Sequence, residues 1–200
     1  MPKIQLLQGS AEWLDYRRMH VMSTDAAPII GESPWKTVED LRREKLGYPI
    51  PEHSKASKEA MERGTRLEPV ARDLFIEKHG VVTPCVYQSD QHPWMATSLD
   101  GISEDGKYFI EIKCPSKKNK HDFSKLSTMD FIYYCQIQHH FLCTGLDYGY
   151  FVSYFPDDLE TPYVEFECRP SRDFMDRLLD NELEFWEKLC KFEEPVWRLK

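Results

Sequence analysis

The sequence predicts one α+β domain built on a mixed, mostly antiparallel sheet that is flanked by helices. Three observations predict this class. Short segments rich in β-branched and aromatic residues lie between longer segments of helical periodicity. A length of 200 residues suits one domain, and 41% hydrophobic residues are enough for a sizeable core. We expect N-terminal helices over about 10–57, a central core over about 58–168 and a C-terminal helix over about 171–193.

Start and stop signals define three short helices in the N-terminal part. Ser10 is a suitable N-cap for the first helix. A second is predicted to begin within residues 23–25 and to end at Gly31, because glycine commonly follows a helix. Thr37 is a suitable N-cap for the third, which should extend to about Leu46.

The rest of the chain supplies the sheet and three longer helices. The strand-like segments are 81–88, 93–99, 108–114, 148–154 and 163–168. The helical segments cover about 58–79, a stretch from Thr128 or Asp130 to Thr144, and Ser171 to about Phe192. The apolar stripe of the first of these helices consists of Leu67, Val70, Ala71, Leu74 and Phe75.

The bulk properties indicate a soluble, intracellular protein. No apolar run approaches the length of a membrane span, and the N-terminus lacks the apolar core of a signal peptide. The net charge of −8 is unusual for a nucleic-acid binder, although a bound metal ion inverts the charge of an acidic site. A small basic cluster, Lys117-Lys118-Asn119-Lys120, is either a solvated loop or a contact for phosphates.

The six cysteines contain no Cys-x-x-Cys pair, which gives little support to a zinc or iron–sulfur site. We expect them to be reduced and mostly buried. Cys114 is interpreted as a strand-end residue rather than a nucleophile, because no orienting base is spaced with it.

Asp100, Glu111 and Lys113 form the most informative pattern. Side chains alternate between the faces of a strand, so Glu111 and Lys113 share one face and Ile112 points into apolar packing. Asp100 lies about ten residues earlier, across a turn, and can return to the same place. Two carboxylates hold a hard divalent cation through oxygen, and a lysine can orient water or neutralise a phosphate. This combination is typical of metal-assisted phosphodiester hydrolysis.

On its own, the Glu-x-Lys pattern is more simply interpreted as the charged, solvent-facing side of a strand. Residues of two predicted helices help to decide between this interpretation and a metal site. Glu68 lies at the edge of a buried helical stripe, where an acid is costly without a partner. Tyr133, Gln136 and His140 form a second stripe of hydrogen-bonding groups, which is either a polar surface or a set of groups aimed at water or DNA. His139 and His140 are adjacent, so they diverge on a helix, and we interpret them as structural or solvent-facing.

These residues, in this order, resemble the PD-(D/E)xK nuclease superfamily, and more narrowly the lambda-type exonucleases, the alkaline exonucleases of phages and viruses. The matching segments extend from Trp13 to Tyr154. They are Glu12-Trp13 with Arg17, Gly64-Thr65-Arg66-Leu67-Glu68, Ser98-Leu99-Asp100-Gly101, Glu111-Ile112-Lys113-Cys114-Pro115 and Gln136-Ile137-Gln138. Leu99 departs from the pattern, because the family often has proline there.

The resemblance implies a role for each matching residue. Asp100 and Glu111 resemble the metal-binding acids, with the Ile112 carbonyl as a further ligand. Lys113 resembles the catalytic lysine, and Glu68 resembles a helix acid that contributes to the metal or water site.

A pocket for a DNA 5′-phosphate is also implied. Arg17, Ser98 and a hydroxyl of Ser23 or Thr24 resemble its members. The sequence leaves the choice of hydroxyl open, and Asp25 beside it would repel phosphate unless it points away, for instance as a helix cap.

The expected function is a Mg²⁺-dependent exonuclease, with Mn²⁺ as an alternative ion, that degrades one strand of double-stranded DNA from 5′ to 3′. Two ions about 3.5–4 Å apart would flank the scissile phosphate. Gln136 is expected near the attacking water, and Tyr133 is expected to contact DNA. The resemblance further implies a processive homotrimeric ring, a single-strand annealing recombinase as partner, and a phage-type protein in the cytoplasm of a bacterial host.

Two rival functions remain open. One is an endonuclease of the same fold, which would cut a closed circular duplex. The other is a non-catalytic DNA-binding module with a decayed site. The presence of Glu68, Asp100, Glu111 and Lys113 together argues against decay.

Overall fold

The computed structural model describes residues 3–52, 54–116 and 130–191. The basic cluster at 117–120, Thr128 as a helix cap and the end of the last predicted helix beyond residue 191 lie outside these ranges.

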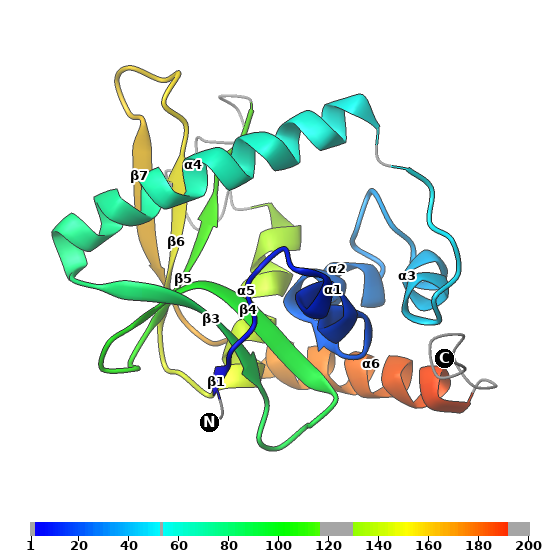
Figure 1. The fold of residues 1–200 in the computed structure, drawn as a ribbon. Helices are drawn as coiled ribbons and strands as arrows, with labels where there is room; N and C mark the ends of the chain where they lie inside the picture. Colours follow the sequence, from blue (N-terminus) through cyan, green and yellow to red (C-terminus); the bar gives the residue numbers. More distant parts are fainter. Residues whose placement is uncertain (1–2, 53, 117–129, 192–200) are drawn as a thin grey trace.

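A mixed β-sheet lies at the centre of the fold (Figure 1). Its strands are β1 (Lys3–Ile4), β2 (Val21–Met22), β3 (Val82–Gln88), β4 (Met95–Ser103), β5 (Phe109–Lys113), β6 (Gly149–Tyr154) and β7 (Tyr163–Cys168). The order is β1-β3-β4-β5-β6-β7, and β2 pairs with β4. The β2–β4 and β5–β6 pairs are parallel and the others are antiparallel. The predicted α+β class with a mixed, mostly antiparallel sheet is therefore confirmed.

The helices begin near the predicted capping residues. They are α1 (Ala11–Arg18), a 3-10 turn (Ser23–Asp25), α2 (Ala26–Ile29), α3 (Val38–Lys45), α4 (Lys55–His79), α5 (Phe131–Thr144) and α6 (Arg172–Lys191). The Ser10 hydroxyl accepts a hydrogen bond from the Trp13 N–H at 3.2 Å. Thr37 and Asp40 cap α3 reciprocally.

Helices cover both faces of the sheet (Figure 1). On one face, Ala71 and Phe75 of α4 pack in a cluster with Ile112 of β5. On the other face, Ile137 and Phe141 of α5 join a cluster with buried side chains of β4 and β5. Helix α6 packs against α5. Strands β4 and β5 are thereby held between α4 and α5.

Two local expectations need correction, and two short strands were not predicted. Strand β4 continues to Ser103 instead of ending at Leu99, and Gly101 lies inside it. A Cβ atom at Gly101 would lie 2.9 Å from the Ile110 side chain, so glycine permits close strand packing here rather than a turn. Val70 is 43% exposed, so the buried stripe of α4 is narrower than predicted. The two-residue strands β1 and β2 are too short for periodicity to reveal.

All six cysteines are free, and three of them are fully buried. Within the described residues, no helix combines the length and apolar character that crossing a bilayer would require.

A buried ion pair anchors the N-terminal elements. Lys45 of α3 contacts Asp25 at 2.6 Å, and the two side chains are 5% and 8% exposed. The same ammonium donates to the carbonyls of Arg17 at 2.7 Å and His20 at 2.6 Å. Asp25 also accepts the Met22 N–H at 2.8 Å. The pair therefore ties α1, the 3-10 turn and α3 together.

Replacing Asp25 by Ala should destabilise the protein by about 3–5 kcal/mol, because it leaves the Lys45 ammonium buried without its counter-ion. Urea denaturation followed by circular dichroism measures this change. Glu184→Ala is the matched control, since its ion pair with Lys188 is more than half exposed and should contribute little to stability. Equal losses in the two variants would contradict the anchoring role.

Candidate active site

The site lies where β4 and β5 separate. Their paired residues include Ile102 with Phe109 and Gly101 with Ile110. Beyond that point, the N–H of Ile112 donates to Oδ2 of Asp100 at 2.7 Å. The Asp100 carboxylate thus accepts a hydrogen bond from the backbone of β5, which fixes Asp100 beside the strand that carries Glu111.

Glu111 is held from both of its carboxylate oxygens, although it is only 1% exposed. Oε1 accepts from Nε2 of Gln136 at 2.6 Å and also contacts the Lys113 ammonium. Oε2 lies 2.9 Å from Nε2 of His140. Ile112 lies on the opposite face in the cluster under α4, so the predicted alternation of faces along β5 is confirmed.

Arg72 links Glu68 to the site. Its guanidinium pairs with the Glu68 carboxylate one turn earlier on α4 and donates to the Asp100 carbonyl at 2.7 Å. Glu68 therefore has the partner that an acid at a buried edge requires. Sequence patterning did not single out Arg72, although its i,i+4 spacing from Glu68 was a usable signal.

Burial and mutual repulsion perturb the acids of the site. Burial, followed by the charges of Glu111 and Glu68, raises the pKa of Asp100 well above its usual value. Burial also raises the pKa of Glu68. For Glu111, burial opposes ionisation, but Lys113 and the His140 hydrogen bond lower the pKa to about 2. The Lys113 pKa is raised, because Glu111 and Asp100 outweigh the effect of burial.

The donor set fits a hard divalent cation. The described residues contain no ready-made group of three or more His, Cys, Asp or Glu side chains arranged for a metal. Magnesium commonly binds one or two carboxylates and takes its other ligands from water and phosphate. Asp100 and Glu111 could provide two such oxygens, and burial together with the charges of Glu111 and Glu68 raises the pKa of Asp100, an effect that a bound cation would oppose.

His139 and His140 are both completely buried, so the solvent-facing interpretation is wrong. His139 lies 2.8 Å from Glu182 of α6 and 3.0 Å from the Ala96 carbonyl. His140 lies between Glu111 and the Thr97 hydroxyl, which is 2.5 Å from Nδ1. The stripe of Tyr133, Gln136 and His140 is likewise not a polar surface, because it faces β5. The spacing of His140 from Gln136 was the available signal.

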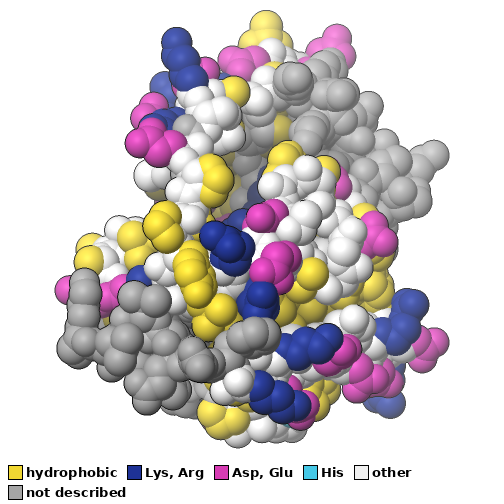
Figure 2. All heavy atoms as spheres, turned by 90° about the vertical axis from the view of Figure 1, so that its right-hand side faces the viewer, with side chains coloured by type: hydrophobic (Ala, Val, Ile, Leu, Met, Phe, Trp, Pro, Cys, Tyr) yellow, Lys and Arg dark blue, Asp and Glu magenta, His cyan; other side chains and the backbone are white. Residues whose placement is uncertain are grey.

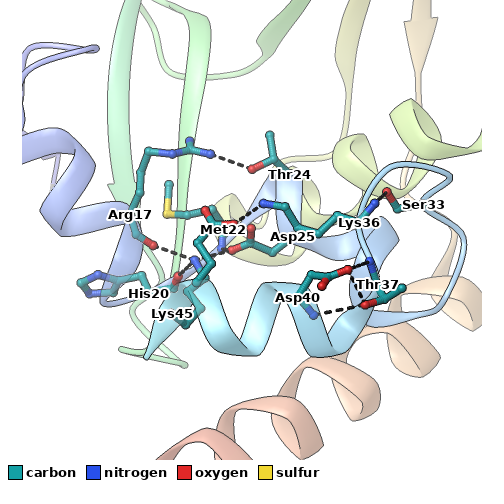
Figure 3. Close-up of polar contacts among 11 residues, drawn as sticks. Arg17, His20, Met22, Thr24, Asp25, Ser33, Lys36, Thr37, Asp40 and Lys45 are labelled. Atoms are coloured by element: carbon teal, nitrogen blue, oxygen red, sulfur yellow. Dashed lines mark hydrogen bonds and ion pairs between the residues drawn. The ribbon is translucent and has the colours of Figure 1, made fainter. Parts of the chain in front are cut away.

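The predicted phosphate-binding residues form a second group beside this one. The guanidinium of Arg17 donates to the Thr24 hydroxyl at 2.7 Å, and the two side chains point toward each other (Figure 3). Arg17 also lies over the Trp13 ring, 4.5 Å from its centroid. The Trp13 indole N–H donates to Ser98 at 3.0 Å. Arg17 therefore contacts Thr24 directly, and Trp13 links Arg17 to Ser98.

Ser23 and Asp25 do not belong to this group. Ser23 is 2% exposed, whereas Thr24 is exposed, so the fold distinguishes two hydroxyls that the sequence left open. Asp25 is turned toward Lys45 and the Met22 N–H (Figure 3). It therefore points away as a cap, as the sequence required for phosphate binding.

One cavity of about 270 Å³ joins the two groups. Its lining includes Thr24 from the second group and Lys113, Tyr133 and Gln136 from the first. The Lys113 ammonium lies 5.1 Å from the Tyr133 ring centroid. On the face at the right of Figure 1, hydrophobic side chains lie beside Lys and Arg side chains next to a hollow (Figure 2).

A family model described as a YqaJ-like viral recombinase domain matches residues 12–147. The chain belongs to this family. The matched range contains every side chain of the two groups described above. The uncharacterised YqaJ protein of Bacillus subtilis (strain 168) is 25% identical over 181 residues, which cover 88% of this chain and 54% of that protein. The chain thus spans about half the length of this curated relative.

Solved structures place this YqaJ-like chain among the alkaline exonucleases in fold. LHK-Exo, an alkaline exonuclease from Laribacter hongkongensis, superimposes with a TM-score of 0.74 at 25% identity, over 90% of this chain and 92% of that one. A complex of LHK-Exo with dAMP matches equally well at 26% identity. A phage-related exonuclease from Haemophilus somnus 129PT shares the fold, with a TM-score of 0.63 at 16% identity over 86% and 95% of the two chains.

Cys114 adjoins the site of this family member but is a poor nucleophile. Burial, followed by the charges of Glu68 and Asp100, raises the pKa of its thiol to about 12. This agrees with its interpretation as a strand-end residue.

Replacing Asp100 by Asn should raise the melting temperature in chelator at pH 8. An acid whose pKa is raised by folding destabilises the native state once the pH exceeds its unfolded pKa, and Asn removes that ionisation. The difference from the unmodified protein should shrink as the pH falls to about 4. Differential scanning fluorimetry over this pH range measures it.

Two controls accompany this measurement. Added Mg²⁺ should stabilise the unmodified protein more than the Asp100→Asn variant. Asp105→Asn should not stabilise, because hydrogen bonds from Lys107 and Ser103 lower the pKa of Asp105 to about 2. An Asp100→Asn variant that melts below the unmodified protein at pH 8 would contradict the electrostatic account.

Proposed function

We propose that this chain is a divalent-metal-dependent exonuclease that degrades one strand of double-stranded DNA from the 5′ end. The observation that carries the proposal is the shared cavity. Lys113 and Gln136, which both contact the buried Glu111, line it together with Thr24, the partner of Arg17. In this proposal, the site for hydrolysis and the site for a terminal phosphate would open into one cavity.

The relatives support this proposal. LHK-Exo is named an alkaline exonuclease and has been solved with dAMP, a nucleoside monophosphate. The family described as viral recombinases also agrees with a role in DNA recombination.

Asp100, Glu111 and the Ile112 carbonyl, assisted by Glu68, would hold Mg²⁺ or Mn²⁺. When bound, such an ion stabilises the negative charge that develops on the phosphate. Arg72 and the Ile112 N–H fix the Asp100 and Glu68 carboxylates in place.

Lys113 would act as a cation and not as a base. Its raised pKa keeps the ammonium protonated at neutral pH, so it donates hydrogen bonds to the attacking water or a phosphate oxygen. Gln136 would orient the same water through its side-chain amide. His140 would keep Glu111 in position through the Oε2 contact. Tyr133 would contact the DNA strand beside Lys113.

Arg17, Thr24 and Ser98 would bind the 5′-phosphate. An arginine beside a hydroxyl is a suitable anion partner, because it forms charge-assisted hydrogen bonds. The structure favours Thr24 over Ser23 for this role, since Ser23 is buried.

A homotrimeric ring, processive digestion, a single-strand annealing recombinase as partner and a location in the bacterial cytoplasm complete the proposal. They follow from the resemblance to lambda-type exonucleases. Light scattering at working concentration tests the ring, and a monomeric mass would contradict it.

Linear duplexes labelled at either end should be shortened from the 5′ end in Mg²⁺ and remain intact in chelator. Lys113→Ala should lose cleavage by roughly a hundredfold or more while DNA binding persists, because the cation that stabilises the reacting phosphate is gone. Gel analysis of the labelled products beside a closed circular duplex measures this. Cleavage of the circle would indicate an endonuclease, and DNA binding without hydrolysis would indicate a non-catalytic module.

Arg17→Ala and Thr24→Val should each reduce the preference for a 5′-phosphorylated end over a 5′-hydroxyl end. Loss of a charge-assisted hydrogen bond corresponds to roughly tenfold or more. The ratio of initial rates on the two ends measures the preference. Ser23→Ala is the matched control and should leave the ratio unchanged, and a loss confined to Ser23→Ala would contradict the assignment of Thr24.

A further inference from the structure

Trp35 lies on the loop between α2 and α3 and is 67% exposed. The loop is held in shape around it. The Ser33 hydroxyl accepts the N–H groups of Trp35 at 3.4 Å and Lys36 at 3.3 Å. Lys36 pairs with Glu44 of α3, and Thr37 caps the start of that helix (Figure 3). A large aromatic side chain is thus presented mostly to solvent on a preorganised segment.

The indole lines the same cavity as the two proposed phosphate sites. Pro28, Ile132 and Tyr133 also line this cavity with apolar groups, and Lys36 adds a cation. Tyr48, another exposed aromatic residue of this region, stacks against Arg43 and is not part of the cavity lining. Location in the cavity therefore distinguishes Trp35 from other exposed apolar side chains.

Chain connectivity indicates what would fill this space. The 5′-terminal nucleotide has its free phosphate on one side and the scissile phosphodiester on the other. With the first on Arg17 and Thr24 and the second beside Lys113 and Gln136, the sugar and base lie between two sites that open into one cavity. The cavity has a volume of about 270 Å³, and we place a single base in it.

We propose that Trp35 binds the base of the 5′-terminal nucleotide by stacking after that base has separated from its complement. This inference rests on the proposed function and adds a residue that captures the separated strand end. Stacking on an aromatic ring tolerates any base, since every base has a π face. That tolerance suits an enzyme that removes nucleotides regardless of sequence. The adjacent Lys36 places positive charge beside the same nucleotide.

A comparison of normal and abasic 5′-terminal nucleotides tests the proposal. In single-turnover digestion, Trp35→Ala should slow removal of a normal terminal nucleotide by roughly tenfold. Trp35→Phe, which keeps an aromatic face, should recover most of the rate. On an abasic terminus the unmodified protein and Trp35→Ala should have equal rates, because there is no base to stack. Tyr48→Ala is the matched control, and thermal melts verify that each variant is folded.

A second arm requires no hydrolysis and separates this inference from the proposed function. In the Lys113→Ala background, the fluorescence of 2-aminopurine at the 5′-terminal position should change on binding, and Trp35→Ala should abolish the change. Equal rates on normal ends, or an unchanged fluorescence response, would overturn the proposal even if exonuclease activity is demonstrated. A Trp35→Ala variant that alters only the mass measured by light scattering would instead assign Trp35 to an interface between copies and would also overturn it.

Discussion

The hydrogen bond between the Ile112 N–H and the Asp100 carboxylate is the contact on which the site depends. An antiparallel pair normally satisfies such a donor with a backbone carbonyl of the neighbouring strand. Here the pairing of β4 and β5 ends at Gly101 and Ile110, and the Asp100 carboxylate accepts the hydrogen bond from the Ile112 N–H instead. The separation brings Asp100 beside Glu111 while the rest of the sheet remains intact. Arg72 of α4 stabilises the same point by binding the Asp100 carbonyl.

The second constraint is the polar interior of α5. Gln136 and His140 from this helix contact Glu111. His139, the residue before His140, contacts Glu182 of α6 and the Ala96 carbonyl of β4. Buried polar groups are stabilising only when their partners are in place. Helix α5 therefore fixes the site and joins α6 to the sheet at the same time.

The N-terminal elements are likewise positioned by a buried polar contact. Lys45 pairs with Asp25 and binds the Arg17 carbonyl, and it thereby stabilises the segment that carries Arg17 and Thr24. Asp25 is thereby neutralised and turned away from the surface where a phosphate would bind. A chain with a net charge of −8 could present the proposed anion site in this way, because Asp25 is paired with Lys45.

The sequence by itself determined what short-range periodicity encodes. The order of the helices and strands, their caps, and the shared face of Glu111 and Lys113 all follow from contacts within a few residues. Motif order also supplied the acids and Gln136 as candidates. Only the tertiary structure decided which partners these residues have. The contacts of His140 with Glu111, Arg72 with Asp100 and Arg17 with Thr24 depend on how separate elements pack. The exposure of Thr24, the burial of Ser23 and the cavity that Trp35 lines arise for the same reason, since exposure and enclosure are properties of the packed chain and not of local sequence.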